Sequence, residues 1–132
     1  MSDTPPIEPA EEKWQKELPP ETFNVMRRHG TERAGSSALN QEHRTGKYAC
    51  AACGLALFES NTKFDSGTGW PSFFAPLLKA VGTTTDRTLG MARTEVHCAR
   101  CGGHLGHVFA DGPKPTGERY CMNGVALKFE PA

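Results

Sequence analysis

Hydrophobic residues from Gly46 onward occur in short runs separated by turn-forming residues. These runs are rich in aliphatic and aromatic side chains, are bounded by Gly, Pro, Asp and Asn, and cover residues 47–49, 55–58, 93–97, 107–109 and 125–129. Short apolar runs between such boundaries are typical of antiparallel strands joined by turns. The chain of 132 residues also contains 14 glycines and 10 prolines, so turns occupy much of it. The pattern predicts a mainly β domain.

A helical pattern occurs before this region, in residues 20–28. Phe23 and Met26 lie three positions apart and therefore share one face of a helix. Pro20 suits the first helical turn and Gly30 suits the helix end. The sequence predicts a short helix here.

The first 20 residues have the composition of an arm. They hold half of the prolines and five of the acids, a composition that suits an arm better than a core. Residues 11–18 could form one short helix with Trp14 and Leu18 on one face, which would dock the arm on the body. We therefore expect an arm over residues 1–20 and a single domain over residues 21–132, with one or two short N-terminal helices in all.

The charge balance narrows the class of partner. The chain has fifteen Lys and Arg residues and fifteen Asp and Glu residues, and so no net charge. Proteins that bind nucleic acids or anionic membranes usually carry a basic excess. No apolar run is long enough to cross a bilayer, and the first residues lack the basic and apolar segments of a secretion signal. We expect a cytoplasmic protein with no nucleic-acid or membrane partner.

Four of the five cysteines form two C-x-x-C-G motifs, Cys50/Cys53 and Cys98/Cys101. Each motif turns two sulfurs inward, and two motifs together supply the four thiolates of a closed, tetrahedral, structural zinc site. The pattern predicts one structural Zn²⁺ per chain. Two disulfides, unligated thiols, a redox-active C-x-x-C pair and iron in place of zinc are alternatives at this stage.

The fifth cysteine, Cys121, is a candidate nucleophile. In a strand, Arg119, Cys121 and Asn123 face the same side, and a guanidinium beside a thiol favours the thiolate. The alternative is a buried apolar cysteine with no chemical role.

Two further segments carry candidate chemistry. His104 and His107 lie just after the second cysteine motif and suit proton donation, since four thiolates leave zinc no need for them. The glycine-rich segment 65–74 delivers Trp70, either to a substrate site or to the core.

These segments together resemble the B-type methionine sulfoxide reductases (the MsrB family), which act on the R epimer of the sulfoxide. The resemblance covers residues 12–129 and rests on segments 30–34, 50–54, 63–73, 98–102, 104–113 and 115–123. It implies two antiparallel sheets and a tetrathiolate zinc site on the side away from the active site.

The resemblance also implies a role for each candidate residue. Cys121 would be the nucleophile, Trp70 would pack the substrate methyl group, and His104 and His107 would lie near the sulfoxide oxygen. The remaining polar residues of the implied site are Asn123, which would belong to the same network, and Asp111 and Arg119, which would orient the residues around it.

One position departs from the family pattern. Many members carry a resolving cysteine where this chain has Thr68, and the other four cysteines belong to the C-x-x-C motifs. An intramolecular disulfide with Cys121 is therefore not expected.

The sequence thus predicts a monomeric protein-repair enzyme of oxidative stress. Cys121 would attack the sulfur of methionine-R-sulfoxide in oxidised proteins and become a sulfenic acid, and thioredoxin or a small thiol would restore it. Two other classes are alternatives: a zinc-knuckle binding module, in which Cys121 would be idle, and a thiol oxidoreductase that works through a C-x-x-C pair.

Overall fold

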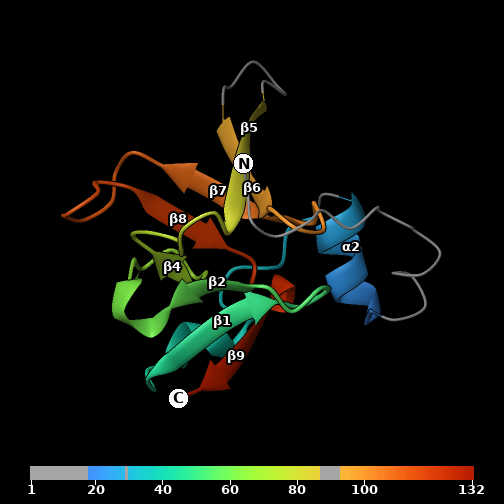
Figure 1. Cartoon of the computed structure of the whole chain (residues 1–132), viewed down its shortest axis with the longest axis horizontal. Helices are drawn as coiled ribbons and strands as arrows, with labels where there is room; N and C mark the ends of the chain where they lie inside the picture. The colour runs from blue at the N-terminus through green and yellow to red at the C-terminus, as the bar shows by residue number, and fades with distance from the viewer. Residues whose placement is uncertain (1–17, 29, 87–92) are drawn as a thin grey trace.

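The computed structural model describes residues 18–28, 30–86 and 93–132, which form two antiparallel sheets and one α-helix (Figure 1). The larger sheet has the order β3-β4-β8-β7-β6-β5, and the smaller has the order β2-β1-β9. The strands are β1 (Gly46–Cys50), β2 (Ala56–Glu59), β3 (Lys63–Phe64), β4 (Ser72–Phe73), β5 (Val81–Asp86), β6 (Arg93–Cys98), β7 (His104–Phe109), β8 (Arg119–Met122) and β9 (Leu127–Pro131). The predicted mainly β fold of two antiparallel sheets is confirmed.

The strands differ from the predicted runs in several places. The run 107–109 belongs to a longer strand that begins at His104. The run 125–129 is split, because Gly124–Ala126 form a 3-10 turn (η4) before β9 begins. A third difference is β5, which has little apolar character; its threonines are β-branched and become a strand by pairing along the whole of β6.

Helix α2 spans Pro20–Arg28, as predicted, and packs against β7 and η4. Phe23 and Met26 are both buried, which confirms the shared apolar face. A Cβ atom on Gly103 would lie 2.6 Å from the Met26 Cε, so a side chain at position 103 would displace the end of the Met26 side chain. Residues 1–17 lie outside the described residues, and with them most of the predicted helix over 11–18 and the docking of Trp14.

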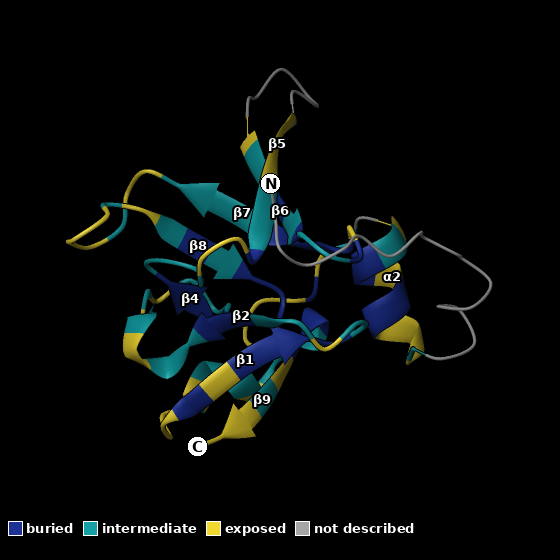
Figure 2. Ribbon diagram, in the orientation of Figure 1, coloured by how far each residue is buried: buried dark blue, intermediate teal, exposed yellow. Residues whose placement is uncertain are grey.

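Aromatic side chains join the two sheets. The ring of Phe58 on β2 stacks on that of Phe73 on β4 at a centroid distance of 4.3 Å, and Tyr48 on β1 meets Phe73 edge-on at 5.0 Å. All three are fully buried. Burial is concentrated where the sheets face each other, and the outer end of β5 is more exposed (Figure 2). This core fixes β4, and β4 pairs directly with the strand that carries Cys121.

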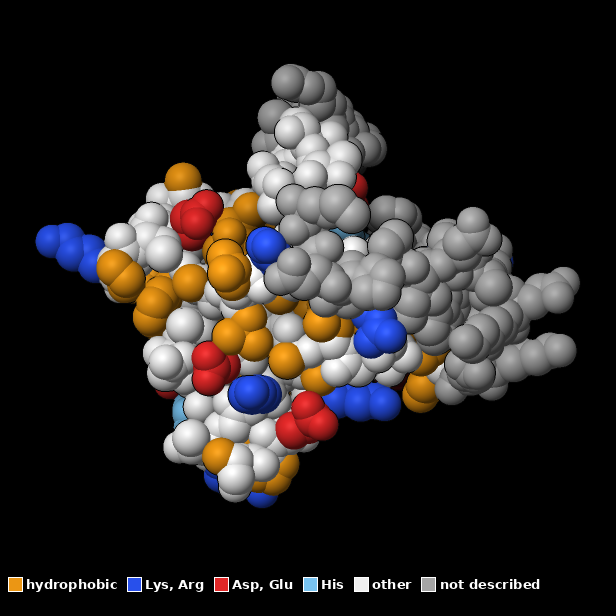
Figure 3. Space-filling view, in the orientation of Figure 1, with side chains coloured by type: hydrophobic (Ala, Val, Ile, Leu, Met, Phe, Trp, Pro, Cys, Tyr) orange, Lys and Arg blue, Asp and Glu red, His pale blue; other side chains and the backbone are white. Residues whose placement is uncertain are grey.

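The surface agrees with the balanced charge of the sequence. On the described part of the face in Figure 3, basic and acidic side chains lie interspersed. No helix within the described ranges is long and apolar enough to span a membrane.

Candidate active site and metal centre

The two C-x-x-C motifs meet at one point. Cys50, Cys53, Cys98 and Cys101 place their sulfur atoms within 4.8 Å of one another, and three of the four side chains are buried. The Cys50 and Cys101 sulfurs are 3.7 Å apart, and the Cys53 and Cys98 sulfurs are 3.5 Å apart. A tetrahedral zinc site with Zn–S bonds of about 2.3 Å separates its sulfurs by about 3.8 Å. The four residues therefore fit a tetrahedral metal ion.

The backbone of each motif forms a tight turn. The amides of Gly54 and Gly102 donate to the carbonyls of Cys50 and Cys98, and both glycines have φ values in the left-handed region, +82° and +74°. A neighbouring sulfur also makes ionisation easier for one member, since the contact with Cys50 lowers the pKa of the Cys53 thiol to about 6. Four sulfurs this close need a cation to balance their charge when they ionise.

Cys121 lies at the centre of the larger sheet. On one side of β8 it is directly opposite Ser72 of β4, and on the other side it is opposite His107 of β7. Residues opposite each other in antiparallel strands project from the same face. The strand register therefore places a hydroxyl, a thiol and an imidazole in one row.

A cavity of about 320 Å³ opens over two members of this row, Cys121 and His107. Its lining brings together five of the sequence-predicted residues, Trp70, His107, Arg119, Cys121 and Asn123, and adds Thr31, Thr68, Arg93, Gly106 and Phe109. His104 and Asp111 do not line it, and neither does any of the four clustered cysteines. The two thiol-bearing regions are therefore separate.

Opposing effects act on the Cys121 thiol, which is half-buried. Burial is the largest of these effects and raises the pKa of the thiol. The hydrogen bond with Thr68 and the nearby Arg119 guanidinium lower this pKa, and the Glu32 carboxylate raises it. The net direction is upward. The predicted proximity of Arg119 to the thiol is confirmed, but the cation does not overcome the effect of burial.

Arg119 is held from two sides. Its Nε and Nη2 atoms donate to the two carboxylate oxygens of Asp111 at 2.9 and 3.1 Å, and its guanidinium stacks over the ring of Phe109 at 4.5 Å. The ion pair lowers the pKa of the Asp111 carboxyl. Paired donors and a ring contact fix the plane of the guanidinium beside the thiol.

Trp70 and Asn123 are both tied to the backbone of Glu32. The indole Nε1 of Trp70 donates to the Glu32 carbonyl at 3.0 Å, and the Glu32 amide donates to Asn123 Oδ1 at 2.9 Å. Asn123 Nδ2 donates to the Leu105 carbonyl at 3.0 Å. Both ends of the buried amide side chain are thus used to hold the backbone around the cavity.

The two histidines occupy different positions. His107 lines the cavity, whereas His104 is 3% exposed and lies behind it. Their ring centroids are 5.4 Å apart, and the Nδ1 atom of His104 is 3.3 Å from the Glu95 carboxylate. The Glu95 carboxylate, the buried His104 imidazole and the cavity-lining His107 imidazole are therefore neighbours, and Glu95 is also directly opposite His107 in the strand register.

Comparison with known proteins decides the family. The SelR domain matches residues 18–131. The chain belongs to the SelR domain family. The expectation of a B-type methionine sulfoxide reductase is confirmed at this level, since several proteins named peptide methionine sulfoxide reductase MsrB are more than half identical to it over most of both chains.

Three of these SelR relatives show the extent of the match. The Leptospira interrogans protein is 51% identical and covers 94% of this chain and 95% of its own. The Leifsonia xyli protein is 54% identical with coverages of 95% and 91%, and the protein of Pseudomonas putida strain W619 is 56% identical with 91% of each chain covered. Among solved structures, the "Yippee-like" domain of Mis18 matches with a TM-score of 0.54 at 17% identity, covering 67% of this chain and 98% of that one, which concerns the fold alone.

Sequence reasoning about this SelR chain missed one residue that organises the site. Glu32 is 8% exposed, its backbone holds Trp70 and Asn123, and its Oε1 accepts a hydrogen bond from the Val125 amide at 3.0 Å. Burial raises the pKa of its carboxyl, and the amides of Gly124 and Val125 oppose this. The sequence around Glu32 is polar and does not indicate that this acid is buried. The amide that donates to its carboxylate, that of Val125, lies about ninety residues away in the sequence.

Proposed function

We propose that this chain reduces methionine-R-sulfoxide in oxidised proteins to methionine, with Cys121 as the nucleophile. The observation that carries the proposal is the row formed by Cys121 and His107, which lie opposite each other on adjacent strands and face one cavity with Trp70. A thiol, a proton donor and an aromatic wall are the groups that sulfoxide reduction requires.

The reaction balances within this cavity. The Cys121 thiolate attacks the sulfoxide sulfur while His107 protonates the departing oxygen, because an unprotonated oxygen leaves the sulfur a poor electrophile. The attack forms a bond between the Cys121 sulfur and the substrate sulfur, and the substrate S–O bond breaks as the protonated oxygen leaves as hydroxide. The hydroxide then attacks the Cys121 sulfur and breaks the S–S bond, which yields methionine and a sulfenic acid. The substrate sulfur is reduced by two electrons and the Cys121 sulfur is oxidised by two.

Other site residues support this step. The Glu95 carboxylate lies 3.3 Å from Nδ1 of His104 and orients this imidazole, and His104 in turn packs edge-on against His107. Asp111 fixes Arg119 beside the thiol, and Asn123 holds the backbone of the cavity wall. We assign these residues to orientation and to charge balance.

R-specificity follows from three fixed contacts. Trp70 would pack the methyl group, His107 would hold the oxygen, and Cys121 must approach the sulfur along the remaining direction. A tetrahedral centre that meets three different groups can satisfy them in only one configuration. The S epimer would direct its oxygen or its methyl group away from its contact.

An external thiol must complete the cycle. In the cavity Thr68 is next to Cys121, and the other four cysteines lie elsewhere. A thiol from thioredoxin or a small molecule would attack the sulfenic sulfur, expel water and form a mixed disulfide, which a second thiol resolves.

The metal has a structural role in this proposal. Cys50, Cys53, Cys98 and Cys101 would hold one Zn²⁺, which fills its coordination with thiolates and leaves no position for substrate. When bound, the ion would stabilise the fold. The division into an arm over residues 1–20 and one catalytic domain over 21–132, the monomeric state, the role in oxidative stress and the cytoplasmic location stay predictions.

The proposal is tested with separated epimers. The protein is incubated with a peptide that contains either methionine-R-sulfoxide or methionine-S-sulfoxide and with excess dithiothreitol, and methionine formation is followed by chromatography. We expect turnover of the R epimer alone, and none in Cys121→Ser. Equal turnover of both epimers, or activity in Cys121→Ser, would refute the proposal.

A further inference from the structure

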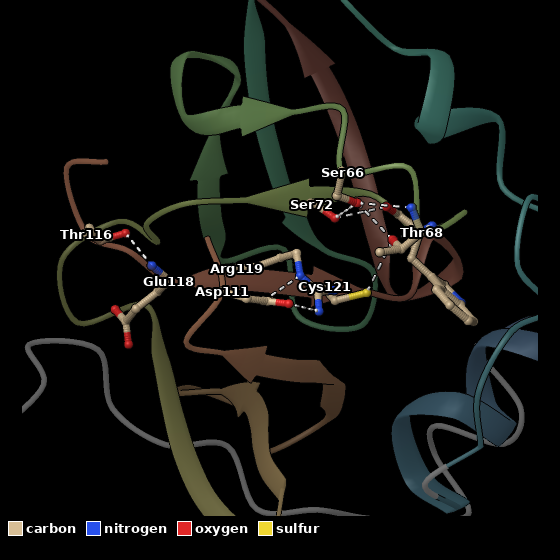
Figure 4. A network of polar contacts seen from close by, with 9 residues as sticks. Ser66, Thr68, Ser72, Asp111, Thr116, Glu118, Arg119 and Cys121 are labelled. Atoms are coloured by element: carbon tan, nitrogen blue, oxygen red, sulfur yellow. Dashed lines mark hydrogen bonds and ion pairs between the residues drawn. The ribbon is translucent and has the colours of Figure 1, made fainter. Parts of the chain in front are cut away.

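A line of three hydroxyl groups ends at the Cys121 sulfur (Figure 4). Ser72 Oγ lies 2.7 Å from Ser66 Oγ, Ser66 Oγ lies 2.8 Å from Thr68 Oγ1, and Thr68 Oγ1 lies 3.9 Å from Cys121 Sγ. The last distance is long, as contacts to a nucleophile often are before substrate binds. Arg119 and Asp111 approach the same thiol from another direction (Figure 4).

The backbone fixes which way these hydroxyls can point. Thr68 Oγ1 accepts from the Trp70 amide at 3.4 Å, and Ser66 Oγ accepts from the Thr68 amide at 3.3 Å. Each hydroxyl has one proton to donate and two lone pairs. Each of these two oxygens therefore has one lone pair and one proton left for its two neighbours in the line. Each hydroxyl must then accept from one neighbour and donate to the other, so all the hydrogen bonds of the line have the same direction.

Two such directions exist, and the geometry satisfies both. With a neutral thiol, Cys121 donates to Thr68, Thr68 to Ser66 and Ser66 to Ser72, whose proton goes to the Trp70 carbonyl at 3.1 Å. With a thiolate, Ser72 donates to Ser66, Ser66 to Thr68, and Thr68 to the sulfur. Within the three hydroxyls only rotations separate the two arrangements, and the thiol proton itself leaves the sulfur through the open cavity.

We propose that Ser72, Ser66 and Thr68 form a reversible hydroxyl chain that supports Cys121 in both of its protonation states. Thr68 touches the reacting sulfur and is a catalytic residue, while Ser66 and Ser72 are positioning residues that act through it. The proposal rests on the proposed function, in which Cys121 is the nucleophile. It assigns a role to Thr68, the residue that stands where many family members have a resolving cysteine.

Other charged groups also face Cys121, and the test must hold them constant. Arg119 lies on the same strand, His107 on the next, Arg93 lines the cavity and Glu32 acts from the segment behind Trp70. Because the hydroxyl variants leave all four in place, a difference between variants reports the hydroxyl chain.

The test is the pH dependence of Cys121 alkylation by iodoacetamide, followed by mass spectrometry of the Cys121 peptide. In Thr68→Val, which keeps the shape and loses the hydroxyl, we expect the midpoint to rise by about one pH unit, because one hydrogen bond to a charged group is lost. Thr68→Ser should restore the wild-type midpoint. Ser66→Ala and Ser72→Ala should move it upward by less, and Ser66→Thr should not move it.

The control is Thr45→Val, an exposed threonine just before β1, which should leave the midpoint unchanged. Thermal melting shows that each variant is folded. A wild-type midpoint in Thr68→Val overturns the proposal, as does a Thr68→Ser midpoint equal to that of Thr68→Val. A wild-type midpoint in Ser66→Ala overturns the chain beyond Thr68.

This test is independent of the proposed function. Alkylation of Cys121 needs no sulfoxide. A raised midpoint in Thr68→Val, in a protein that fails to reduce either epimer, would support the chain and refute the reductase. R-specific turnover with unchanged midpoints would do the reverse.

Discussion

The cysteine cluster and Cys121 present the same chemical group in opposite surroundings. The four clustered sulfurs contact one another within 4.8 Å and lie on turns that join strands of both sheets. Cys121 lies away from the cluster, in a strand of the larger sheet and under an open cavity, with the Thr68 hydroxyl and the Arg119 guanidinium beside it. The neighbours of each thiol, rather than the thiol itself, suit the cluster to a metal ion and Cys121 to the attack proposed for it.

Burial acts differently in the two regions. In the cluster, burial excludes solvent from a site whose charge a cation can balance, so it favours a stable complex. At Cys121, burial is the largest effect on the thiol and raises its pKa. Arg119 and Thr68 then offset part of this effect, which keeps the thiolate accessible without a metal.

The largest expected effect comes from breaking the cluster. Cys101→Ser should abolish stoichiometric zinc and leave unstable or insoluble protein, because a structural zinc supplies folding free energy on the order of 10 kcal/mol. Metal analysis and thermal melting measure this. Cys121→Ser is the matched control and should bind zinc and melt normally. Metal-free protein of unchanged thermal stability would contradict the prediction.

The next effect concerns the proton donor beside Cys121. His107→Ala should slow methionine formation in a single turnover by roughly 10²–10⁴, the usual contribution of a general acid. His104→Ala should slow it less, because His104 acts through its neighbour. His43→Ala, an exposed histidine outside the site, serves as the control. Full activity in a variant lacking both His104 and His107 would exclude an imidazole acid.

A smaller effect is expected at Arg119. The thiolate is an anion, so removing the adjacent cation raises the pKa of Cys121 further, and the rising limb of the pH–rate profile moves to higher pH. If the pKa of Cys121 rises by about one in Arg119→Leu, the activity at pH 7 should fall about tenfold and recover in more basic buffer. Arg119→Lys should retain part of the activity, and Arg44→Leu should retain all of it. An unchanged profile in Arg119→Leu would show that the cation does not act on the thiol.

The smallest expected effect is a change in the oxidised product at Cys121, with the fold unchanged. Wild-type protein given R-sulfoxide without reductant should release about one methionine per chain and leave a sulfenic acid at Cys121 that dimedone traps. Thr68→Cys should instead form a disulfide with Cys121, since the side chain at 68 contacts that sulfur. Peptide mapping separates the two products.

One result for the wild type would contradict this prediction. A disulfide from Cys121 to a clustered cysteine, with zinc release in step with methionine release, would show that the two regions exchange thiols. It would leave the reductase activity itself intact.

Sequence patterns predicted the parts of the molecule that local rules govern. The helix over 20–28 follows from its spacing and from Pro20, and the metal set follows from two C-x-x-C-G motifs that form similar turns. The stretch Leu127 to Phe129 was also found, because alternating apolar residues form a half-buried strand.

The remaining parts depend on contacts between distant segments. Strand β5 is mostly threonine and becomes a strand only because β6 pairs with it. The burial of Glu32 and the alignment of Ser66 with Ser72 require the packed loops, and nothing in the sequence near these residues indicates it. The family resemblance indicated the residues of the site, but only the structure shows which of them hydrogen-bond to one another.

The position of the cysteine cluster has a consequence for how the molecule assembles. Cys50 ends a strand of the smaller sheet and Cys98 ends a strand of the larger one, with the turns of Cys53 and Cys101 beside them. A chain whose sheets have not yet met offers only two thiolates at either place, which is half of a tetrathiolate site. With zinc as the proposed metal, full-affinity capture would come late in folding, and zinc content would count the completed molecules in a preparation.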